Sequence, residues 1–266
     1  LPPATIHKLK EVLLDAIAVA VAGAEAPGVS GVVKTVKSWG GSGEARLVVD
    51  GTRVPAPSAA MVNAMMIHAM DFDNMHEQAG VHASACTVPA ALAAAEAVGG
   101  VDGKRLLKAV AIAIDFICRL GLAVPLYRGW HTTTILGVYG ATVAAANILG
   151  LDVEKTADAL GIAYSQCAGT RQGRLEGALT KRLQPALAAR SGLTAAWLSR
   201  AGITGPREIL EGEWGLLRVY SEDHSRKSLD TGVAVLMDGL GQRFLGDELS
   251  LKAFPCCKAT HTGIEA

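Results

Sequence analysis

The spacing of apolar positions predicts a chain built mainly from helices. Apolar residues over 6–20 recur every three or four positions, as on one face of an amphipathic helix, with Thr5 as the expected N-cap and Gly23 at the end. Similar patterns predict helices over 32–39 and 58–68. The fold class we expect is therefore mainly α.

One short segment departs from the helical pattern. The sequence EARLVVDGTRV, from Glu44 to Val54, has two runs typical of β-strands around Asp50-Gly51. Asp-Gly between such runs is a strong local signal for a hairpin. We expect a small β-hairpin here.

The most informative feature is an internal repeat of about fifty residues. His82 begins HASACTVPAALAAAEAVGG, and 49 residues later His131 begins HTTTILGVYGATVAAANILG, which has the same plan of a polar helix start and an Ala-rich apolar helix. Each is followed by a second helix, with Asp102 or Asp152 as its expected cap.

A third, weaker copy begins at Lys181, fifty residues beyond His131, and its second helix is expected to open at Thr204 and Pro206. The repeat predicts a stack of helical hairpins. If the copies pack side by side, His82, His131 and Lys181 lie at the same end of neighbouring buried helices and converge on one pocket.

The character of the chain changes after Gly215, where charged residues cluster in SEDHSRKSLD and strand-like runs alternate with glycines. We therefore divide the chain into an all-α domain over 1–215 and the beginning of a second domain over 216–266.

Charge and composition narrow the classes of partner. The formal net charge is zero with no basic stripe, so the electrostatic attraction that drives nucleic-acid binding is missing. The apolar stretch from Leu106 to Leu126 contains Lys108, Asp115 and Arg119, which are costly in a bilayer, so we expect a buried helix and no membrane partner. Half of the residues are hydrophobic but only 5% are aromatic, which favours small side chains and closely packed helices.

Cofactor signals are equally sparse. The cysteines have none of the usual zinc-ligand spacings, and no phosphate-binding glycine motif occurs. We expect reduced thiols in a cytoplasmic protein that uses neither a metal nor another cofactor.

The converging residues could transfer protons. A histidine at the first turn of a buried helix is kept neutral by the helix dipole, and a neutral ring can take a proton from carbon next to a carboxylate. Lys181 and Arg182 supply cations for the developing charge. Asp71, after the apolar run VNAMMIHAM, is either a surface helix end or part of the site.

Other polar residues near Asp71 have weaker claims. Asp73 and His76 follow it closely, and the pair His68 and Asp71 could form only a local surface contact.

These residues sit within motifs that resemble, nearly end to end, those of the MmgE/PrpD family. The motifs are HAMDFDN, the His82 segment, GWHTTT, ALTKRLQPALAARSG, GITGPREILEG and LKAFPCCKATH. The resemblance implies a large all-α domain with a smaller α/β lid, a site between them and usually a homodimer. It also implies metal-independent chemistry on di- or tricarboxylates.

By the same resemblance, the site residues fall on Asp71, His82, His131 and Lys181, and Lys252 is the lid lysine that binds a substrate carboxylate. We expect Thr132 and Arg182 to bind substrate as well. The chain departs from the family pattern at Met75, where some members have threonine, and in a spacing from Asp71 to His82 that is one residue longer. The lid is expected to be incomplete, because family members continue beyond Ala266.

Three hypotheses follow. The first is a hydro-lyase that dehydrates a 2-methylcitrate-like substrate, with His131 or His82 as the base in interchangeable roles. The second is an epimerase or decarboxylase that uses the same proton-transfer centre. The third is a truncated, non-catalytic helical-repeat protein, in which His82, His131 and Lys181 would not meet.

Overall fold

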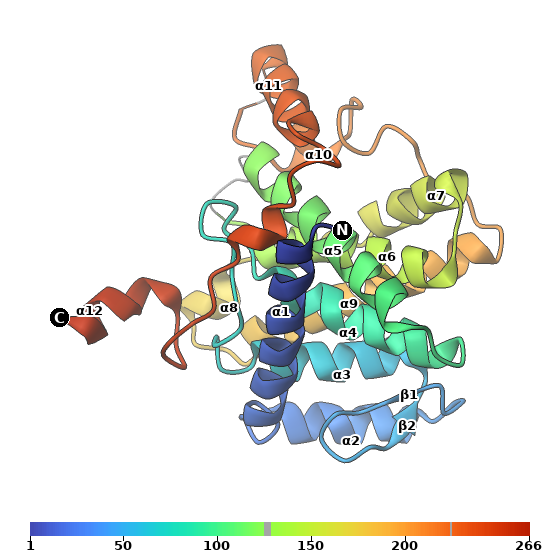
Figure 1. Cartoon of the computed structure of the whole chain (residues 1–266), viewed down its shortest axis with the longest axis vertical. Coiled ribbons are helices and arrows are strands. Elements are labelled where there is room, and N and C mark those ends of the chain that lie inside the picture. The colour runs from blue at the N-terminus through green and yellow to red at the C-terminus, as the bar shows by residue number, and fades with distance from the viewer. Residues whose placement is uncertain (125–128, 224) are drawn as a thin grey trace.

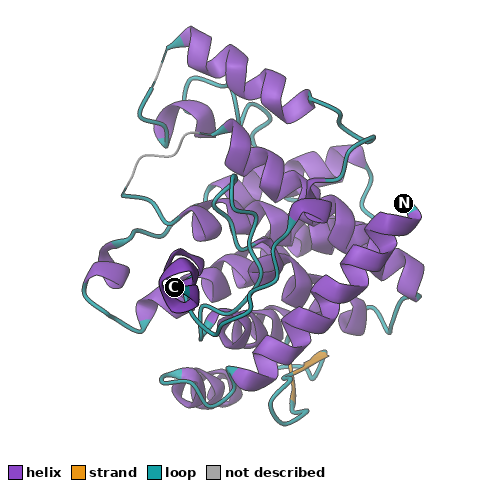
Figure 2. Ribbon diagram, turned by 60° about the vertical axis from the view of Figure 1, so that its left-hand side comes forward, coloured by secondary structure: helices purple, strands orange, loops and turns teal. Residues whose placement is uncertain are grey.

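The computed structural model describes residues 1–124, 129–223 and 225–266, and it is mainly α, as predicted (Figures 1 and 2). The larger elements are α1 (Pro3–Ala22), α2 (Val29–Trp39), α3 (Ala56–His68), α4 (Ala83–Ala97), α5 (Gly103–Ala123), α6 (Thr132–Leu149), α7 (Val153–Tyr164), α9 (Thr180–Arg200) and α11 (Arg226–Met237). The shorter ones are β1 (Ala45–Arg46), β2 (Arg53–Val54), α8 (Gln172–Leu175), α10 (Leu216–Val219), α12 (His261–Glu265) and two 3₁₀ turns, Leu245–Glu248 and Lys258–Thr260.

The core is formed by α3, α4, α6 and α9, which pack against one another. Small residues make this close packing possible. A Cβ atom on Gly192 of α9 would lie 2.5 Å from the carbonyl oxygen of Val138, and one on Gly137 of α6 would lie 2.5 Å from the sulfur of Cys86. At these contacts the helices approach to a distance that only glycine permits.

The repeat is confirmed for its first two copies. The pairs α4 with α5 and α6 with α7 follow the predicted plan, and the side chains of Asp102 and Asp152 accept hydrogen bonds from the backbone amides of Arg105 and Lys155, each at 2.8 Å. The third copy is incomplete. Helix α9 is present, but the helix predicted at Pro206 is wrong, because 203–209 forms turns and irregular backbone.

Two other predictions concern the first sixty residues. The hairpin is confirmed, with Ala45 paired to Val54, although each strand has only two residues. The prediction of Thr5 as an N-cap is wrong: α1 begins at Pro3, and the hydroxyl of Thr5 donates to Asp247 at 2.8 Å. Proline at the first helical position removes an amide that would otherwise lack a partner, so this start needs no side-chain cap.

The charges within the apolar stretch Leu106–Leu126, whose last two residues lie outside the described part of the chain, tie α5 to the C-terminal segment. Arg119 pairs with Asp115 at 2.7 Å and donates to the carbonyl oxygens of Leu236 and Asp238. Asp115 in turn accepts from the amide of Leu245 at 2.9 Å. A buried charge is tolerable when it is paired and hydrogen-bonded, as here.

Only one β-bridge, Met75 with Ser250, involves the described residues after position 240, so the strand-like runs expected there do not form a sheet within the chain. By length and composition, α6 is apolar enough to cross a membrane, but 83% of it is buried inside the protein, as is typical of a core helix.

Candidate active site

The starts of three repeat helices meet at one end of the core. His82 is the N-cap of α4, His131 is the N-cap of α6, and Lys181 lies in the first turn of α9. The backbone amide of His82 donates to the hydroxyl of Thr133 at 3.1 Å, which joins the first turns of α4 and α6. The predicted convergence is therefore present, contrary to what the non-catalytic hypothesis expects.

Asp71 connects these residues. One carboxylate oxygen, Oδ2, lies 3.1 Å from Nζ of Lys181, and the other, Oδ1, lies 3.5 Å from Nε2 of His82 and 3.3 Å from Nζ of Lys252. Lys252 also donates to the carbonyl oxygen of Asp71. Asp71 is thus part of a charged cluster and is not a surface helix end.

The backbone of Asp71 is unusual. Its φ of 53° makes it the one non-glycine residue of the described chain in the left-handed region. Aspartate tolerates this conformation better than most residues, and such strain is common at functional sites. The turn follows α3 directly and brings Asp71 and Asp73 toward the helix starts.

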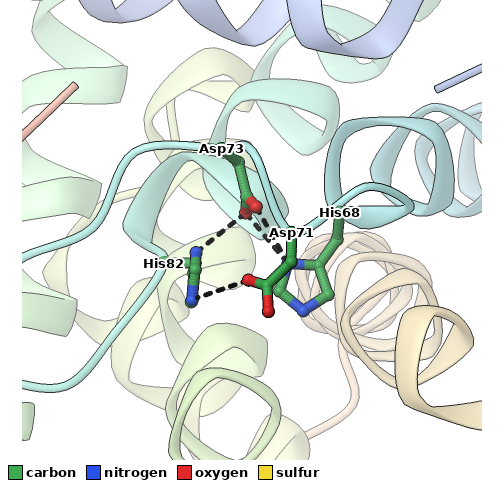
Figure 3. A group of neighbouring side chains, drawn as sticks. All are labelled: His68, Asp71, Asp73 and His82. Carbon is green, nitrogen blue, oxygen red and sulfur yellow. Dashed lines mark hydrogen bonds and ion pairs between the residues drawn. The ribbon is translucent and has the colours of Figure 1, made fainter. Parts of the chain in front are cut away.

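Asp73 lies behind Asp71 and is fully buried (Figure 3). Its Oδ2 lies 2.9 Å from Nδ1 of His68 and 3.2 Å from Nδ1 of His82. The rings of His68 and His82 are edge to face, with centroids 4.9 Å apart. His68 pairs with Asp73 and not with Asp71, so the expected local contact between His68 and Asp71 does not describe this site.

His131 is held from a different direction. Its Nδ1 lies 2.7 Å from the hydroxyl oxygen of Thr134 and 3.0 Å from Oε1 of Gln184. The amide nitrogen of Gln184 donates to the carbonyl oxygen of Thr170 at 2.8 Å, which turns Oε1 toward the ring. Because Oε1 can only accept, Nδ1 carries the proton and Nε2 has a free lone pair.

Two histidines of the site, His131 and His68, have lowered pKa values. Burial, followed by the nearby His68 and Lys181, lowers the pKa of His131 to about 3. Burial is therefore the main cause, whereas the sequence suggested the helix dipole. Burial also lowers the pKa of His68. Both rings are neutral near pH 7.

The two carboxylates stay ionised despite their burial. Burial acts to raise the pKa of Asp71, but Lys181, His68 and His82 outweigh it and hold this pKa well below its ordinary value. For Asp73, burial is likewise outweighed by His68 and His82, so its pKa is also well below the usual range. Asp71 therefore faces the ammonium groups of Lys181 and Lys252, whereas Asp73 faces the rings of His68 and His82.

A cavity of about 770 Å³ opens in front of this cluster. Asp71, His82, His131, Thr132, Lys181 and Arg182 all line it, whereas Lys252 does not. The side chain of Lys252 is fully buried against Asp71, so its expected contact with a substrate carboxylate stays a prediction. Further cations line the cavity wall: Arg171, Arg174 and Lys258.

Four residues could together offer ligands to a metal ion. One donor atom each from His68, Asp71, Asp73 and His82 lie within 4.8 Å of one another. However, both oxygens of Asp71 already face ammonium groups, and Nε2 of His68 lies 3.0 Å from Nζ of Lys181. An ammonium group carries positive charge and offers no lone pair to a metal ion, so this cluster fits a metal poorly.

The sequence did not assign His68, Asp73 or Gln184 clear roles. The available signal for Asp73 was its position two residues after Asp71, directly after the same apolar helix. Gln184 lies three residues after Lys181 on the same helix, one turn further from its start. Its contact with His131 comes from the packing of α6 on α9 and has no local signature.

The fold and the site define a class of protein: a helical-hairpin domain whose helix starts bring two histidines and a lysine to one cavity, beside an ionised aspartate. The model of the MmgE/PrpD N-terminal domain matches residues 1–228, and the chain belongs to this family.

Curated relatives agree with this assignment. The cis-aconitate decarboxylase of Aspergillus terreus is 28% identical over 275 residues, covering 100% of this chain and 56% of the relative. The cis-aconitate decarboxylase of Homo sapiens is 32% identical over 216 residues, covering 79% of this chain and 43% of the relative. That of Mus musculus is 29% identical over 218 residues, covering 79% and 42%. The chain spans about half the length of these relatives.

Proposed function

We propose that this protein is a lyase acting on a small tricarboxylate, and specifically that it decarboxylates a substrate of the cis-aconitate type. One observation carries the proposal: His82, His131 and Lys181, from three repeat helices, meet at one cavity with the ionised Asp71. Dehydration was the first hypothesis from the sequence. The names of the relatives favour decarboxylation instead.

The cavity wall suits a substrate with several negative charges. Lys181, Arg182, Arg171, Arg174 and Lys258 all line it. Planar guanidinium groups bind carboxylates through paired hydrogen bonds. Neither Arg171 nor Arg174 has an ion-pair partner among the described residues, so both are available to a polycarboxylate.

Decarboxylation of cis-aconitate needs a proton donor. The bond to the carboxylate on the saturated arm breaks and carbon dioxide leaves, while its electron pair forms a new terminal double bond. The pair of the original double bond moves to the carbon of the other arm, which takes up one proton. The product therefore carries one negative charge fewer than the substrate.

His82 is placed to supply that proton. It lines the cavity, and its two ring nitrogens face Asp73 and Asp71 at 3.2 Å and 3.5 Å. A ring protonated on both nitrogens would form ion pairs with both carboxylates, and its Nε2 faces Asp71, which itself lines the cavity. Lys181 and the arginines would hold the two carboxylates that remain on the product.

One observation favours a second candidate, the dehydration of a 2-methylcitrate-like acid. His131 is neutral, with Nδ1 bound and Nε2 free, which is the state required of a general base. In that reaction Nε2 would take the proton next to a carboxylate, and His82 would protonate the departing hydroxide as water.

The two candidates leave different isotopic traces. We would incubate the protein with cis-aconitate and, separately, with 2-methylcitrate in deuterium oxide, and follow the products by proton NMR. Decarboxylation predicts release of carbon dioxide and one deuterium in the new methylene group. Dehydration predicts loss of water from 2-methylcitrate with no gas released. If the protein turns over neither acid, the proposal is contradicted.

A further inference from the structure

A buried histidine–aspartate pair lies directly behind the cavity. The side chains of His68 and Asp73 are both fully buried, and neither residue lines the cavity. Asp73 binds Nδ1 of His68 at 2.9 Å, and Nε2 of His68 lies 3.0 Å from Nζ of Lys181. These contacts form a continuous chain from a buried carboxylate to a cation in the cavity wall.

The chemistry of the donors fixes where the protons lie. A carboxylate only accepts hydrogen bonds, so Nδ1 of His68 carries a proton that it donates to Asp73. An ammonium group only donates, so Nε2 of His68 has a lone pair that accepts from Lys181. His68 is therefore neutral, with its proton on Nδ1, and it turns the negative end of the ring toward Lys181.

This arrangement also orients the ammonium group of Lys181. Two of its three N–H bonds are directed to fixed acceptors, Nε2 of His68 at 3.0 Å and Oδ2 of Asp71 at 3.1 Å. Lysine is otherwise a flexible point charge with freely rotating donors. With two donors held, the third is left for a group in the cavity, which Lys181 lines.

The same carboxylate reaches the proposed proton donor. Oδ2 of Asp73 lies 3.2 Å from Nδ1 of His82, so one buried oxygen contacts the rings of both His68 and His82 (Figure 3). Asp73 therefore couples the position of the His82 ring to the orientation of Lys181. Asp71 joins the proton donor and the carboxylate-binding cation from the cavity side, and Asp73 joins them from the buried side through His68.

We propose that His68 and Asp73 are positioning residues that aim Lys181 and His82 at the substrate, an inference that rests on the proposed function. Neither side chain touches the substrate. Their contribution is to keep an ammonium N–H and a ring N–H fixed relative to each other before the substrate arrives, which is how active sites avoid reorganising during the reaction.

Two substitutions of His68 separate positioning from simple loss of packing. In His68→Gln, the amide oxygen occupies the place of Nε2 and still accepts from Lys181. In His68→Asn, the amide reaches only the place of Nδ1, so it can contact Asp73 but not Lys181. We expect His68→Asn to lower kcat/KM on the order of 100-fold, because a misplaced group near the reacting atoms typically costs that much. His68→Gln should lose about tenfold less.

His76→Asn is the matched control. His76 is also buried in this region, where its Nδ1 accepts from the amide of Ala79 at 3.2 Å, and it contacts neither Lys181 nor Asp73. Asparagine keeps an acceptor for that amide. The control should leave kcat/KM within about twofold of the parent protein, because His76 contacts none of the positioned groups, although a substitution at this buried site lowers stability.

A second measurement does not depend on turnover. In protein labelled with ¹⁵N-histidine, two-bond couplings assign the tautomer of each ring, and His68 should be neutral with its proton on Nδ1 near pH 7. Calorimetry with tricarballylate, a saturated tricarboxylate that cannot react, should show weaker binding in His68→Asn than in His68→Gln.

The outcomes separate this inference from the proposed function. If no substrate is turned over but the tautomer and binding order are as expected, the proposed reaction is wrong and the positioning stands. A proton on Nε2 of His68 would overturn the positioning. So would equal losses in His68→Gln and His68→Asn, in activity or in tricarballylate binding, whatever reaction the protein catalyses.

Discussion

Oε1 of Gln184 lies 3.0 Å from Nδ1 of His131, and this contact between two core helices determines which nitrogen of the histidine is free. The amide cannot rotate without breaking its bond to the carbonyl oxygen of Thr170. The ring therefore presents Nε2 unprotonated, in the same way that carboxylates orient histidines in other proton-transfer sites.

Changing Gln184 should alter catalysis without touching the substrate. Gln184→Met keeps the volume but removes the acceptor, so the proton of His131 is no longer confined to Nδ1, and we expect kcat/KM to fall by about tenfold or more. Gln184→Glu keeps an acceptor and should retain more activity than Gln184→Met. Steady-state kinetics of both variants test this, and equal activities would show that the contact does not orient the ring.

Replacing Asp71 should separate charge from backbone conformation. Asp71→Asn preserves a residue that tolerates the left-handed φ of 53° but removes the charge that faces Lys252, whose side chain is fully buried. Loss of a partner for a buried charge typically costs about 3–5 kcal/mol.

Asp71→Ala should be less stable still, by about 1 kcal/mol, because alanine adds the cost of the left-handed backbone. Urea unfolding of the two variants measures both quantities. The reverse order of stabilities would show that φ at this position costs nothing.

Acid should destabilise the protein through His131. Its pKa is about 3 in the folded chain and about 6.5 when unfolded, so between these values the unfolded state binds more protons and stability falls as the pH falls. The lowered pKa of Asp71 acts in the same direction at still lower pH, below its unfolded value of about 3.9.

His131→Asn, which cannot titrate, should therefore lose less stability than the parent between neutral pH and about pH 4. Thermal unfolding across this range provides the measurement. Parallel stability curves for parent and variant would mean that folding does not lower the pKa of His131.

Two arginines of the cavity wall should affect binding more than turnover. Arg171→Ala combined with Arg174→Ala removes two cations that line the cavity, so KM for a tricarboxylate should rise about tenfold while kcat changes little. Arg200→Ala, on an exposed residue at the far end of α9, is the control and should leave both constants unchanged. An unchanged KM in the double variant would place the substrate elsewhere in the cavity.

Close helix packing predicts opposite effects of two glycine substitutions. Gly192→Ala places a Cβ atom 2.5 Å from the carbonyl oxygen of Val138 and should destabilise the fold by about 1–3 kcal/mol. Gly103→Ala, at the first position of α5 with open space around it, should be neutral or stabilising by up to about 1 kcal/mol. Chemical denaturation compares them directly.

The repeat was visible in the sequence because it is a local pattern. Polar starts, Ala-rich helices and Asp caps recur at a fixed interval, so the convergence of His82, His131 and Lys181 could be predicted from the expectation that equivalent helices stack in parallel. The third copy was mispredicted beyond α9 because a proline and a cap residue permit a helix but do not require one.

The support of the site was not predictable in the same way. His68 and Asp73 are five residues apart across a turn that depends on the left-handed conformation of Asp71, a feature that no apolar pattern reports. Gln184 acts on His131 through the packing of α6 against α9, at a sequence separation of fifty-three residues. Contacts of this kind follow from tertiary structure and have no periodic signature.

The shared oxygen of Asp73 limits how the site can diverge. A substitution there changes the proton donor and the cation at the same time, so a new substrate cannot be accommodated by adjusting one and preserving the other. The exposed cavity wall carries no such linkage, since Arg171 and Arg174 stand apart from the buried cluster. Engineering a different acid preference should therefore begin at the wall, where single changes can be selected independently.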